Sequence, residues 1–426
     1  MSKREADLSE VQQHILTAER DAARIDGVSA DTPRIPIKRV GILGAGTMGG
    51  GIAMNFLSIG TPVTIVERDR AALERGIATI RRNYERAVSR GRLAAEDVER
   101  ALALLTPSLV IDELADSDLI IEAVFENVAV KKDVFRKLDA IARPGAILAS
   151  NTSRLDIDAI AAETRRPEAV IGLHFFSPAN VMRLLEIVRG AKTGPSQLAT
   201  AMDLAGRIGK IAVVSGVCPG FIGNRMLGRR QAQAQRLILE GARPWDVDRV
   251  LTEFGFPMGP FQMSDLAGLD LGWRRETSKG DSIRDLLCER DRRGQTSKGY
   301  YDYDAERVAT PSPEVEALIA EFASSRGYRS RQVADDEILE RLLYPMIDEG
   351  MKILDDSIAQ RASDIDVVWL NGYGWPARTG GPMFWAERVG IGRIAARLQF
   401  HADKLGSDAA LSPRLARSAA SAGHAD

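Results

Sequence analysis

The sequence has little cysteine and no long apolar run, and each absence excludes a class of protein. Only Cys218 and Cys288 are cysteines among 426 residues, which is too few for a disulfide framework and not the spacing of metal ligands. We therefore expect structural thiols in a reducing compartment and no bound metal. No run approaches the roughly 18 apolar residues of a membrane span, the N-terminus has no signal core, and Gly423-His-Ala-Asp426 is no peroxisomal signal. These features predict a cytoplasmic protein without a membrane partner.

An excess of charge of one sign is also missing. The 57 basic and 59 acidic residues give a formal net charge of −2, and no basic stripe with interleaved aromatic residues is present, so we expect no nucleic-acid partner. Hydrophobic residues make up 45% of the chain, enough to form a core in each of two or three domains. A globular protein of several domains is predicted.

The first half of the chain alternates short β-rich runs with helical stretches. Residues 1–37 contain a helix-permissive segment and a Gly/Pro linker, which we interpret as an appendage. The expected strands are 39–43, 63–66, 119–124, 146–150, 170–175 and 211–215. Strands separated by helices predict a parallel, doubly wound sheet over residues 38–216, the Rossmann type of α/β fold.

The second half is helical and contains a repeat. Trp245-Asp-Val-Asp248, Gly255-Phe-Pro257 and Gly259-Pro-Phe261 return as Ser363-Asp-Ile-Asp366, Gly374-Trp-Pro376 and Gly381-Pro-Met383. We therefore expect two repeated all-α domains, over 217–305 and 330–406. The alternative is a chance likeness of Gly/Pro turns. The Ala- and Ser-rich tail, 407–426, is expected to be disordered.

Three glycines follow the first expected strand in the spacing of a dinucleotide-binding turn. Gly44 permits the tight turn, Gly46 lets the backbone approach a pyrophosphate, and Gly49 allows close packing of helix against strand. Glu67 ends the second strand, where a carboxylate can accept hydrogen bonds from ribose hydroxyls and disfavours the 2′-phosphate of NADP. Because Arg68 could bind that phosphate, NADP stays an alternative to the preferred cofactor, NAD.

His174 is the candidate general base. Of the four histidines, His14 lies in the appendage, His401 in a terminal helix and His424 in the tail. His174 instead lies where an apolar strand runs out into a turn, and the carboxyl ends of such strands are where ligands bind. An imidazole titrates near neutral pH and can take a hydroxyl proton, although a histidine in an apolar strand is more often a core residue.

Glu186 is the candidate partner of that histidine. It is the one carboxylate in a hydrophobic, strand-like run, Met182 to Val188, placed 12 residues later as an antiparallel return would be. A buried carboxylate is costly unless it is paired, and imidazole is its natural partner. An exposed Glu186 would mean that no such pair exists.

Several segments together carry a family resemblance. They are Gly44-x-Gly46-x-x-Gly49, Ser150-Asn-Thr-Ser153, Gly172-Leu-His-Phe-Phe-Ser-Pro178, Leu185-Glu186 and Pro219-Gly-Phe-Ile-Gly-Asn224-Arg225. In order and spacing, residues 38 to about 400 resemble the 3-hydroxyacyl-CoA dehydrogenase family. The similarity is closest to the dehydrogenase half of multifunctional fatty-acid β-oxidation enzymes, which also carry a second helical repeat.

The resemblance implies an NAD-dependent enzyme that oxidises an (S)-3-hydroxyacyl-CoA thioester to the 3-oxoacyl-CoA. It implies that His174 is the general base, that Glu186 orients it, and that Ser153 and Asn224 hydrogen-bond the substrate. A helix N-cap and a turn residue are the structural alternatives for these two. The implied cofactor contacts are Gly44, Gly46, Thr47, Met48, Gly49, Glu67, Val124, Phe125, Glu126, Lys131, Ser153 and Ser177.

Two departures from the family pattern matter. Short stand-alone members have asparagine where this chain has Ser177, although multifunctional members share the serine. The hydratase half that precedes the multifunctional dehydrogenases has no counterpart in residues 1–37, so we expect no hydratase activity and a separate enoyl-CoA hydratase as partner. Because short members dimerise through a helical domain that is duplicated here, the chain can be a monomer. A dehydrogenase of a free 3-hydroxy acid and a non-catalytic NAD-binding partner subunit remain alternatives.

Overall fold

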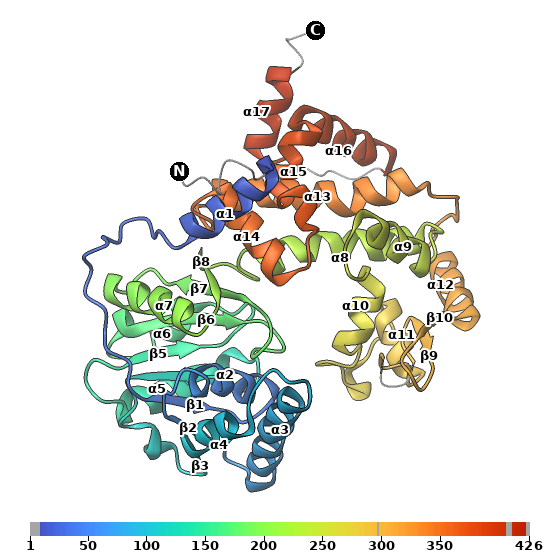
Figure 1. The fold of residues 1–426 in the computed structure, drawn as a ribbon. Helices are drawn as coiled ribbons and strands as arrows, with labels where there is room; N and C mark the ends of the chain where they lie inside the picture. The colour runs from blue at the N-terminus through green and yellow to red at the C-terminus, as the bar shows by residue number, and fades with distance from the viewer. Residues whose placement is uncertain (1–8, 296–297, 406–410, 423–426) are drawn as a thin grey trace. The chain divides into compact units, whose positions relative to one another are not determined.

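The structure is a computed structural model that describes residues 9–295, 298–405 and 411–422. It divides into two compact units (Figure 1). The first contains the chain up to Arg225 together with Ile353–Tyr373 and Thr379–Phe384, and the second contains Met226–Lys352, Gly374–Arg378 and the chain from Trp385 onward. Within the described ranges, no helix combines the length and apolar character needed to cross a membrane.

An eight-stranded sheet forms the centre of the first unit. Its strand order is β3-β2-β1-β4-β5-β6-β7-β8. The strands are β1 (Val40–Leu43), β2 (Val63–Val66), β3 (Leu105–Ser108), β4 (Leu119–Glu122), β5 (Ile147–Ser150), β6 (Val170–Phe175), β7 (Leu184–Arg189) and β8 (Ile211–Gly216). All neighbours are parallel except β6 and β7, which are antiparallel. The doubly wound sheet is confirmed, and the single reversal at β7 departs from an all-parallel arrangement.

Helices cover both faces of this sheet because its strands are apolar on both sides. Neighbouring residues of one strand, such as Ile42 and Leu43, belong to different hydrophobic clusters. One cluster includes side chains of α2 (Thr47–Leu57), α3 (Arg70–Ser89), α4 (Ala95–Ala103) and α7 (Pro195–Arg207). The other includes side chains of α5 (Val128–Ile141) and α6 (Ile157–Ala161).

The N-terminal segment is an integral part of the first unit. Helix α1 (Glu10–Ala22) begins at a capping box formed by Ser9 and Gln12 and packs against α14 (Ala362–Gly372) and β8. Figure 1 shows α1 and α14 side by side. Ile25 and Ile37 of the linker are buried in the sheet cluster. The interpretation of residues 1–37 as an appendage is therefore wrong for the described part, because it buries its own apolar face.

The second unit is built mainly of helices. They are α8 (Gly223–Leu239), α9 (Pro244–Phe254), α10 (Pro260–Ala267), α11 (Ile283–Glu289), α12 (Pro313–Ser325), α13 (Asp335–Asp355), α15 (Pro382–Val389), α16 (Ile391–Leu405) and α17 (Pro413–Ala422). Of these, α8 and α15 begin in the first unit and α13 ends in it. A small antiparallel pair, β9 (Tyr301–Tyr303) and β10 (Ala309–Pro311), lies at the expected domain boundary. The second repeat is not a separate domain, because part of it belongs to the first unit.

The two repeats share one local design. Asp248 accepts hydrogen bonds from the backbone N–H groups of Phe261 and Gln262 at the start of α10. Asp366 accepts them in the same way from Met383 and Phe384 at the start of α15. A carboxylate at a helix N-terminus satisfies amides that have no partner within the helix. This equivalence supports a true duplication over a chance likeness of turns.

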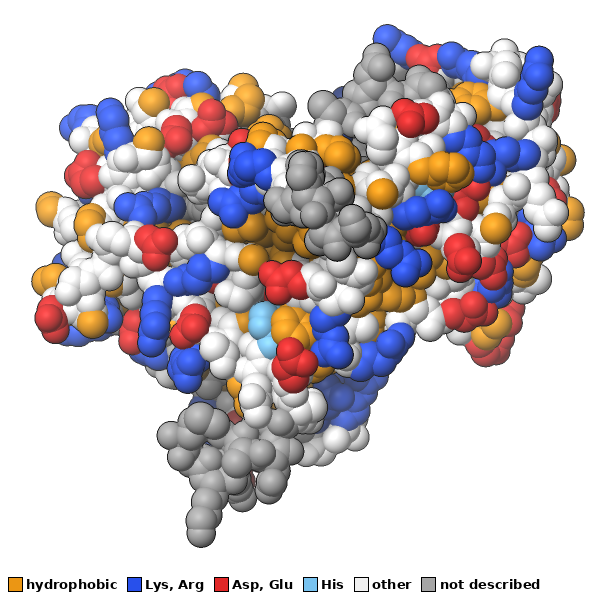
Figure 2. Space-filling view, turned by 90° about the horizontal axis from the view of Figure 1, so that it is seen from above, with side chains coloured by type: hydrophobic (Ala, Val, Ile, Leu, Met, Phe, Trp, Pro, Cys, Tyr) orange, Lys and Arg blue, Asp and Glu red, His pale blue; other side chains and the backbone are white. Residues whose placement is uncertain are grey.

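Two further observations concern the tail and the surface. Residues 413–422 form α17, with Leu415 fully buried and the Ser412 N–H bonded to Asp348, so the expectation of a disordered tail fails there. Residues 406–410 and 423–426 lie outside the described ranges. Acidic and basic side chains are interspersed over the face in Figure 2, in keeping with the near-zero net charge.

Candidate active site

The glycine-rich turn between β1 and α2 has the geometry that its sequence predicts. Gly44 has φ +107°, and a Cβ there would lie 2.6 Å from the Ala123 carbonyl oxygen. A Cβ on Gly49 would lie 1.9 Å from the Gly44 carbonyl oxygen. Gly46, the N-cap of α2, would place its Cβ in space with no atom within 4 Å. The turn therefore leaves room at Gly46 and at the free amides of the α2 N-terminus, which suits a pyrophosphate.

A cavity of about 480 Å³ adjoins this turn. Its lining includes Gly46, Thr47, Glu67 and Phe125, four of the expected cofactor contacts. Glu67 accepts hydrogen bonds from the Ala45 and Arg68 N–H groups, so its carboxylate is fixed at the end of β2 with lone pairs to spare. These residues fit the adenosine and pyrophosphate of a dinucleotide. The lining also includes Arg75, Asn83 and Asn180, which belong to no motif recognised in the sequence.

Glu126 anchors the loop that follows β4. Its Oε1 accepts hydrogen bonds from Thr152 Oγ1 at 2.7 Å, from the Ser153 N–H at 2.8 Å and from Ser153 Oγ at 3.1 Å. Burial alone raises the pKa of Glu126, but these hydrogen bonds and the charge of Lys131 outweigh it and hold the pKa below its usual range. Glu126 is therefore an ionised acceptor that fixes Ser153.

Lys131 lies beneath this loop. Its side chain is 0% exposed, and its Nζ lies 2.6 Å from Glu122 Oε1 and 3.5 Å from Glu126 Oε2. Glu122, also fully buried, accepts hydrogen bonds from Ser150 Oγ and the Val124 N–H as well. Such a satisfied buried cluster rigidifies its surroundings. Lys131 thus supports the predicted contact segment from below, with no exposed surface of its own.

The other expected cofactor contacts lie at the surface of the same unit. Phe125 is 80% exposed, an unusual state for a large apolar side chain. Ser177 is exposed in the loop after β6, and Met48 and Val124 are partly buried. Exposed apolar surface beside a cavity is typical of a ligand site.

His174 and Glu186 form the buried pair that the sequence predicts. They lie directly opposite each other on β6 and β7, with His174 Nδ1 2.7 Å from Glu186 Oε2. His174 is 6% exposed and Glu186 0%. Within the described residues, the imidazole Nε2 has no hydrogen-bond partner, so it is the ring atom available for a proton.

The backbone of the turn before α8 holds Glu186 from its other side. Glu186 Oε1 accepts hydrogen bonds from the Ile222 N–H at 3.2 Å and the Gly223 N–H at 3.1 Å. This turn contains Phe221 at φ +52°, a strained conformation for an aromatic residue that is held by full burial of its side chain. All the hydrogen bonds of Glu186 thus come from protein groups that fix its position.

Ser153 and Asn224 lie close together in the same unit. Asn224 Nδ2 donates to the Ser153 backbone carbonyl at 3.3 Å. Ser153 is not a helix N-cap, because Asp156 caps α6, and Asn224 lies in the first turn of α8 and not in an isolated turn. Both structural alternatives for these residues therefore fail.

Two supporting residues escaped the sequence reasoning. Asn151 Oδ1 accepts the Phe175 N–H at 3.0 Å and so ties β5 to the end of β6 beside His174. Lys210 Nζ donates to the carbonyls of Ala179 and Met182, each at 2.6 Å, and holds the loop after β6. Burial lowers the pKa of Lys210 to about 8. Asn151 stands within a motif, whereas nothing in sequence could reveal the target of Lys210.

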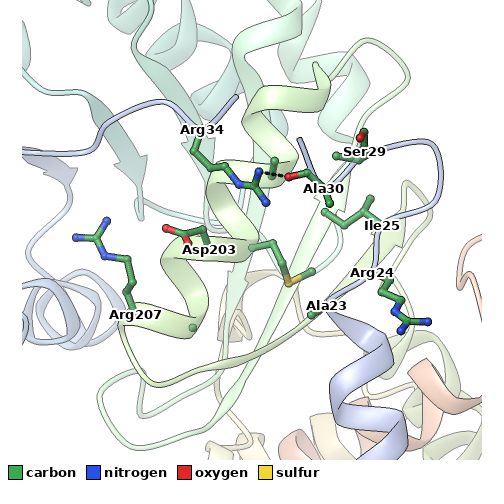
Figure 3. Close-up of a pocket in the computed structure, with 12 residues that line it drawn as sticks. Ala23, Arg24, Ile25, Ser29, Ala30, Arg34, Asp203 and Arg207 are labelled. Carbon is green, nitrogen blue, oxygen red and sulfur yellow. Dashed lines mark hydrogen bonds between the residues drawn. The ribbon is translucent and has the colours of Figure 1, made fainter. Parts of the chain in front are cut away.

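The remaining described histidines and a second cavity lie elsewhere. His14 pairs with Asp366, and His401 pairs with Glu340. A cavity of about 870 Å³ lies between the linker and α7 and includes Arg24, Arg34 and Arg207 (Figure 3). None of its lining residues belongs to the expected site.

Comparison with known proteins places this site in a family. Residues 39–218 match the NAD binding domain of 3-hydroxyacyl-CoA dehydrogenase, and residues 220–303 match the C-terminal domain of the same family. The dehydrogenase part of multifunctional enzyme 1 from C. elegans is 30% identical, with a TM-score of 0.68, over 96% of this chain and 97% of that one. The 3-hydroxybutyryl-CoA dehydrogenase of Escherichia coli is 28% identical, with a TM-score of 0.78, over 92% of this chain and 100% of that one.

The fold, the glycine turn and these matches define an NAD-dependent oxidoreductase. The chain belongs to the 3-hydroxyacyl-CoA dehydrogenase family, which confirms the resemblance found in its motifs.

A curated relative corrects one expectation. The "Peroxisomal bifunctional enzyme" of Danio rerio is 43% identical over 86% of this chain, which spans 53% of that relative's length. Since a relative this similar is named as peroxisomal, the prediction of a cytoplasmic location is wrong. The domain motifs could not show this, because they report the fold, whereas location is set by short targeting segments that are independent of the fold.

Proposed function

We propose that the chain oxidises (S)-3-hydroxyacyl-CoA thioesters to 3-oxoacyl-CoA with NAD. The observation that carries this proposal is the buried hydrogen bond of 2.7 Å between His174 Nδ1 and Glu186 Oε2, at the carboxyl end of β6. This arrangement is the one that an alcohol dehydrogenation needs from its protein, because the hydroxyl proton requires a positioned base.

His174 acts as the general base through Nε2. Glu186 fixes the imidazole tautomer with the proton on Nδ1, which leaves the Nε2 lone pair to accept the proton of the C3 hydroxyl. The imidazolium that results lies against the Glu186 carboxylate, whose charge stabilises it. Since Glu186 is already held by two backbone N–H groups, little reorganisation is needed during the reaction.

Ser153 and Asn224 hold the substrate in this proposal. Ser153 Oγ hydrogen-bonds the reacting hydroxyl, and the Asn224 amide donates to the thioester carbonyl without competing for the proton. The proposed cofactor contacts are Gly44, Gly46, Thr47, Met48, Gly49, Glu67, Val124, Phe125, Glu126, Ser153 and Ser177. Lys131 supports these contacts through its ion pairs with Glu122 and Glu126. NAD held by these residues would supply the acceptor for the hydride from C3.

The association state and the partner are further parts of the proposal. The duplicated helical repeat supplies within one chain the kind of surface that short relatives use for dimerisation, so the protein is a monomer. A separate enoyl-CoA hydratase that supplies the 3-hydroxyacyl-CoA is its proposed partner. Light scattering at micromolar and nanomolar concentrations tests the first statement, and an obligate dimer would contradict it.

The deciding experiment measures NADH formation with (S)-3-hydroxyacyl-CoA esters of graded size and with the matching free acids. Thioesters are expected to react and free acids to react poorly. His174→Gln is expected to lower kcat by a factor of about 10² to 10⁴, with NAD affinity retained, because the proton acceptor is lost. His14→Gln, the same change in another histidine bonded to a buried carboxylate, is the control and should keep normal kcat. Equal loss in both variants, or none in His174→Gln, would remove His174 from its role.

A further inference from the structure

Tyr373, the residue after α14, brings a side chain from the second helical repeat to the catalytic residues of the first unit. Its hydroxyl lies 2.9 Å from Asn224 Oδ1. Its ring meets that of Phe176 edge-on, with centroids 5.4 Å apart. A Cβ on Gly223 would lie only 2.2 Å from Tyr373 Cε2, so the ring packs directly on that glycine's backbone. Tyr373 therefore touches the surroundings of the proposed site at three points.

Two hydrogen bonds, to the Ser153 carbonyl and from the Tyr373 hydroxyl, set the orientation and position of the Asn224 amide. The Ser153 carbonyl can only accept, so the amide must turn its Nδ2 toward it, at 3.3 Å. Oδ1 then faces Tyr373, whose hydroxyl donates to it. With both of these contacts made, the second Nδ2 hydrogen is left to donate to a substrate carbonyl. A flipped amide would lose the bond to the Ser153 carbonyl, and the Tyr373 hydroxyl would then have to accept from Nδ2.

The ring contacts lead to the catalytic pair. Phe176 lies against the His174 imidazole, with ring centroids 4.3 Å apart. Gly223, on which the tyrosine ring packs, donates its N–H to Glu186 at 3.1 Å. The ring thus supports both members of the pair from outside, and the hydroxyl acts on Asn224.

We propose that Tyr373 is a positioning residue that orients Asn224 for the substrate carbonyl, and that the second repeat is therefore part of the active site. This inference rests on the proposed function for its effect on turnover. The effect of Tyr373 on the Asn224 side chain is independent of the proposed function, because that effect can be observed without substrate.

The kinetic test removes only the hydroxyl. Tyr373→Phe is expected to lower kcat/KM for the thioester roughly threefold to tenfold, the effect of one lost neutral hydrogen bond. In an Asn224→Ala background the same change should have no further effect, because the group on which it acts is gone. Tyr84→Phe is the matched control, since the buried Tyr84 hydroxyl has no hydrogen-bond partner among the described residues and should leave kcat/KM unchanged. Equal losses from Tyr373→Phe in both backgrounds would overturn the proposal.

A second measurement does not depend on activity. The ¹⁵N side-chain amide signal of Asn224, assigned by its loss in Asn224→Ala, is expected to shift and exchange faster with water in Tyr373→Phe but not in Tyr84→Phe. An unchanged signal would overturn the positioning role. If no thioester yields NADH with the wild-type protein, the proposed function fails while this signal still decides whether Tyr373 holds Asn224.

Discussion

At the scale of the residue, Glu186 decides how well the imidazole is held. It is fully buried and accepts hydrogen bonds from His174 and from two backbone N–H groups. Glu186→Gln keeps the shape but presents a neutral amide, which cannot stabilise an imidazolium. We expect kcat to fall by a factor of about 10² or more. Its measured pH-rate profile should differ from that of the wild type, and an unaltered profile would contradict the pairing.

Single residues were predictable from sequence where a motif or the chemistry isolates them. His174 stood out by elimination, and the spacing of Glu186 indicated an antiparallel partner. The family resemblance implies that Lys131 is a cofactor contact. Its burial between Glu122 and Glu126 depends on how β4 and α5 pack, which no spacing reveals. The sequence does not identify Tyr373 as a site residue, because 149 residues separate it from Asn224 and no motif links the two.

At the scale of the element, the turn between β1 and α2 contains one glycine that folding requires, Gly49, and another that binding requires, Gly46. We expect Gly49→Ala to destabilise the protein by a few kcal/mol, because its Cβ would lie 1.9 Å from a carbonyl oxygen. Gly46→Ala should keep the stability, since φ is −70° and its Cβ meets no atom within 4 Å. NAD affinity should nevertheless fall, because the methyl group occupies the approach of the pyrophosphate.

Thermal unfolding and NAD titration of both variants check this pair. If Gly46→Ala binds NAD as tightly as the wild type, the pyrophosphate does not approach the backbone there. Gly206→Ala in α7, whose Cβ also meets no atom within 4 Å, is the control that should change neither NAD affinity nor the fold.

Elements with a strong pattern were predicted closely. Expected strands 63–66 and 170–175 coincide with β2 and β6. The strand β3 was missed because Leu-Thr-Pro-Ser has neither alternation nor a β-branched run, and its pairing with β2 alone makes it a strand. Helix α17 was missed because a composition rich in Ala and Ser does not reveal that Leu415 finds a buried position.

At the scale of the whole molecule, the sequence predicts the duplication but not the division into units. The repeat motifs are visible as Gly/Pro turns around Asp248 and Asp366. The apolar residues of α14 and the helix pattern of α1 give no indication that these helices pack against each other and β8. Tertiary packing decides which apolar faces meet. The sequence alone therefore could not show that part of the second repeat belongs to the first unit.

The buried aspartates at the helix starts should make stability depend on pH. Burial raises the pKa of Asp248 from 3.8 to about 6 and also raises the pKa of Asp366. The folded protein then binds the proton more tightly than the unfolded chain. The protonated form of each aspartate therefore contributes fully to stability below the pKa that the residue has in the unfolded chain. This contribution is lost as the pH rises through the higher pKa that the residue has in the folded protein. For Asp248 the loss between pH 3.8 and about 6 is roughly 1–3 kcal/mol.

Asp248→Asn removes this titration. Its oxygen still accepts from the Phe261 N–H, and Tyr301 can turn its hydroxyl to accept from the new amide. The Gln262 N–H loses its acceptor, which lowers the stability of the variant by the same amount at every pH. We expect the free energy of unfolding of Asp248→Asn, relative to wild type, to rise by about that 1–3 kcal/mol between pH 4.5 and 7.5 in urea titrations. Asp335→Asn is the control. The hydrogen bond from Arg249 lowers the pKa of Asp335, so this carboxyl is already ionised over the whole range. Parallel curves for wild type and Asp248→Asn would show that Asp248 does not take up a proton on folding, and the pH dependence would have to arise elsewhere.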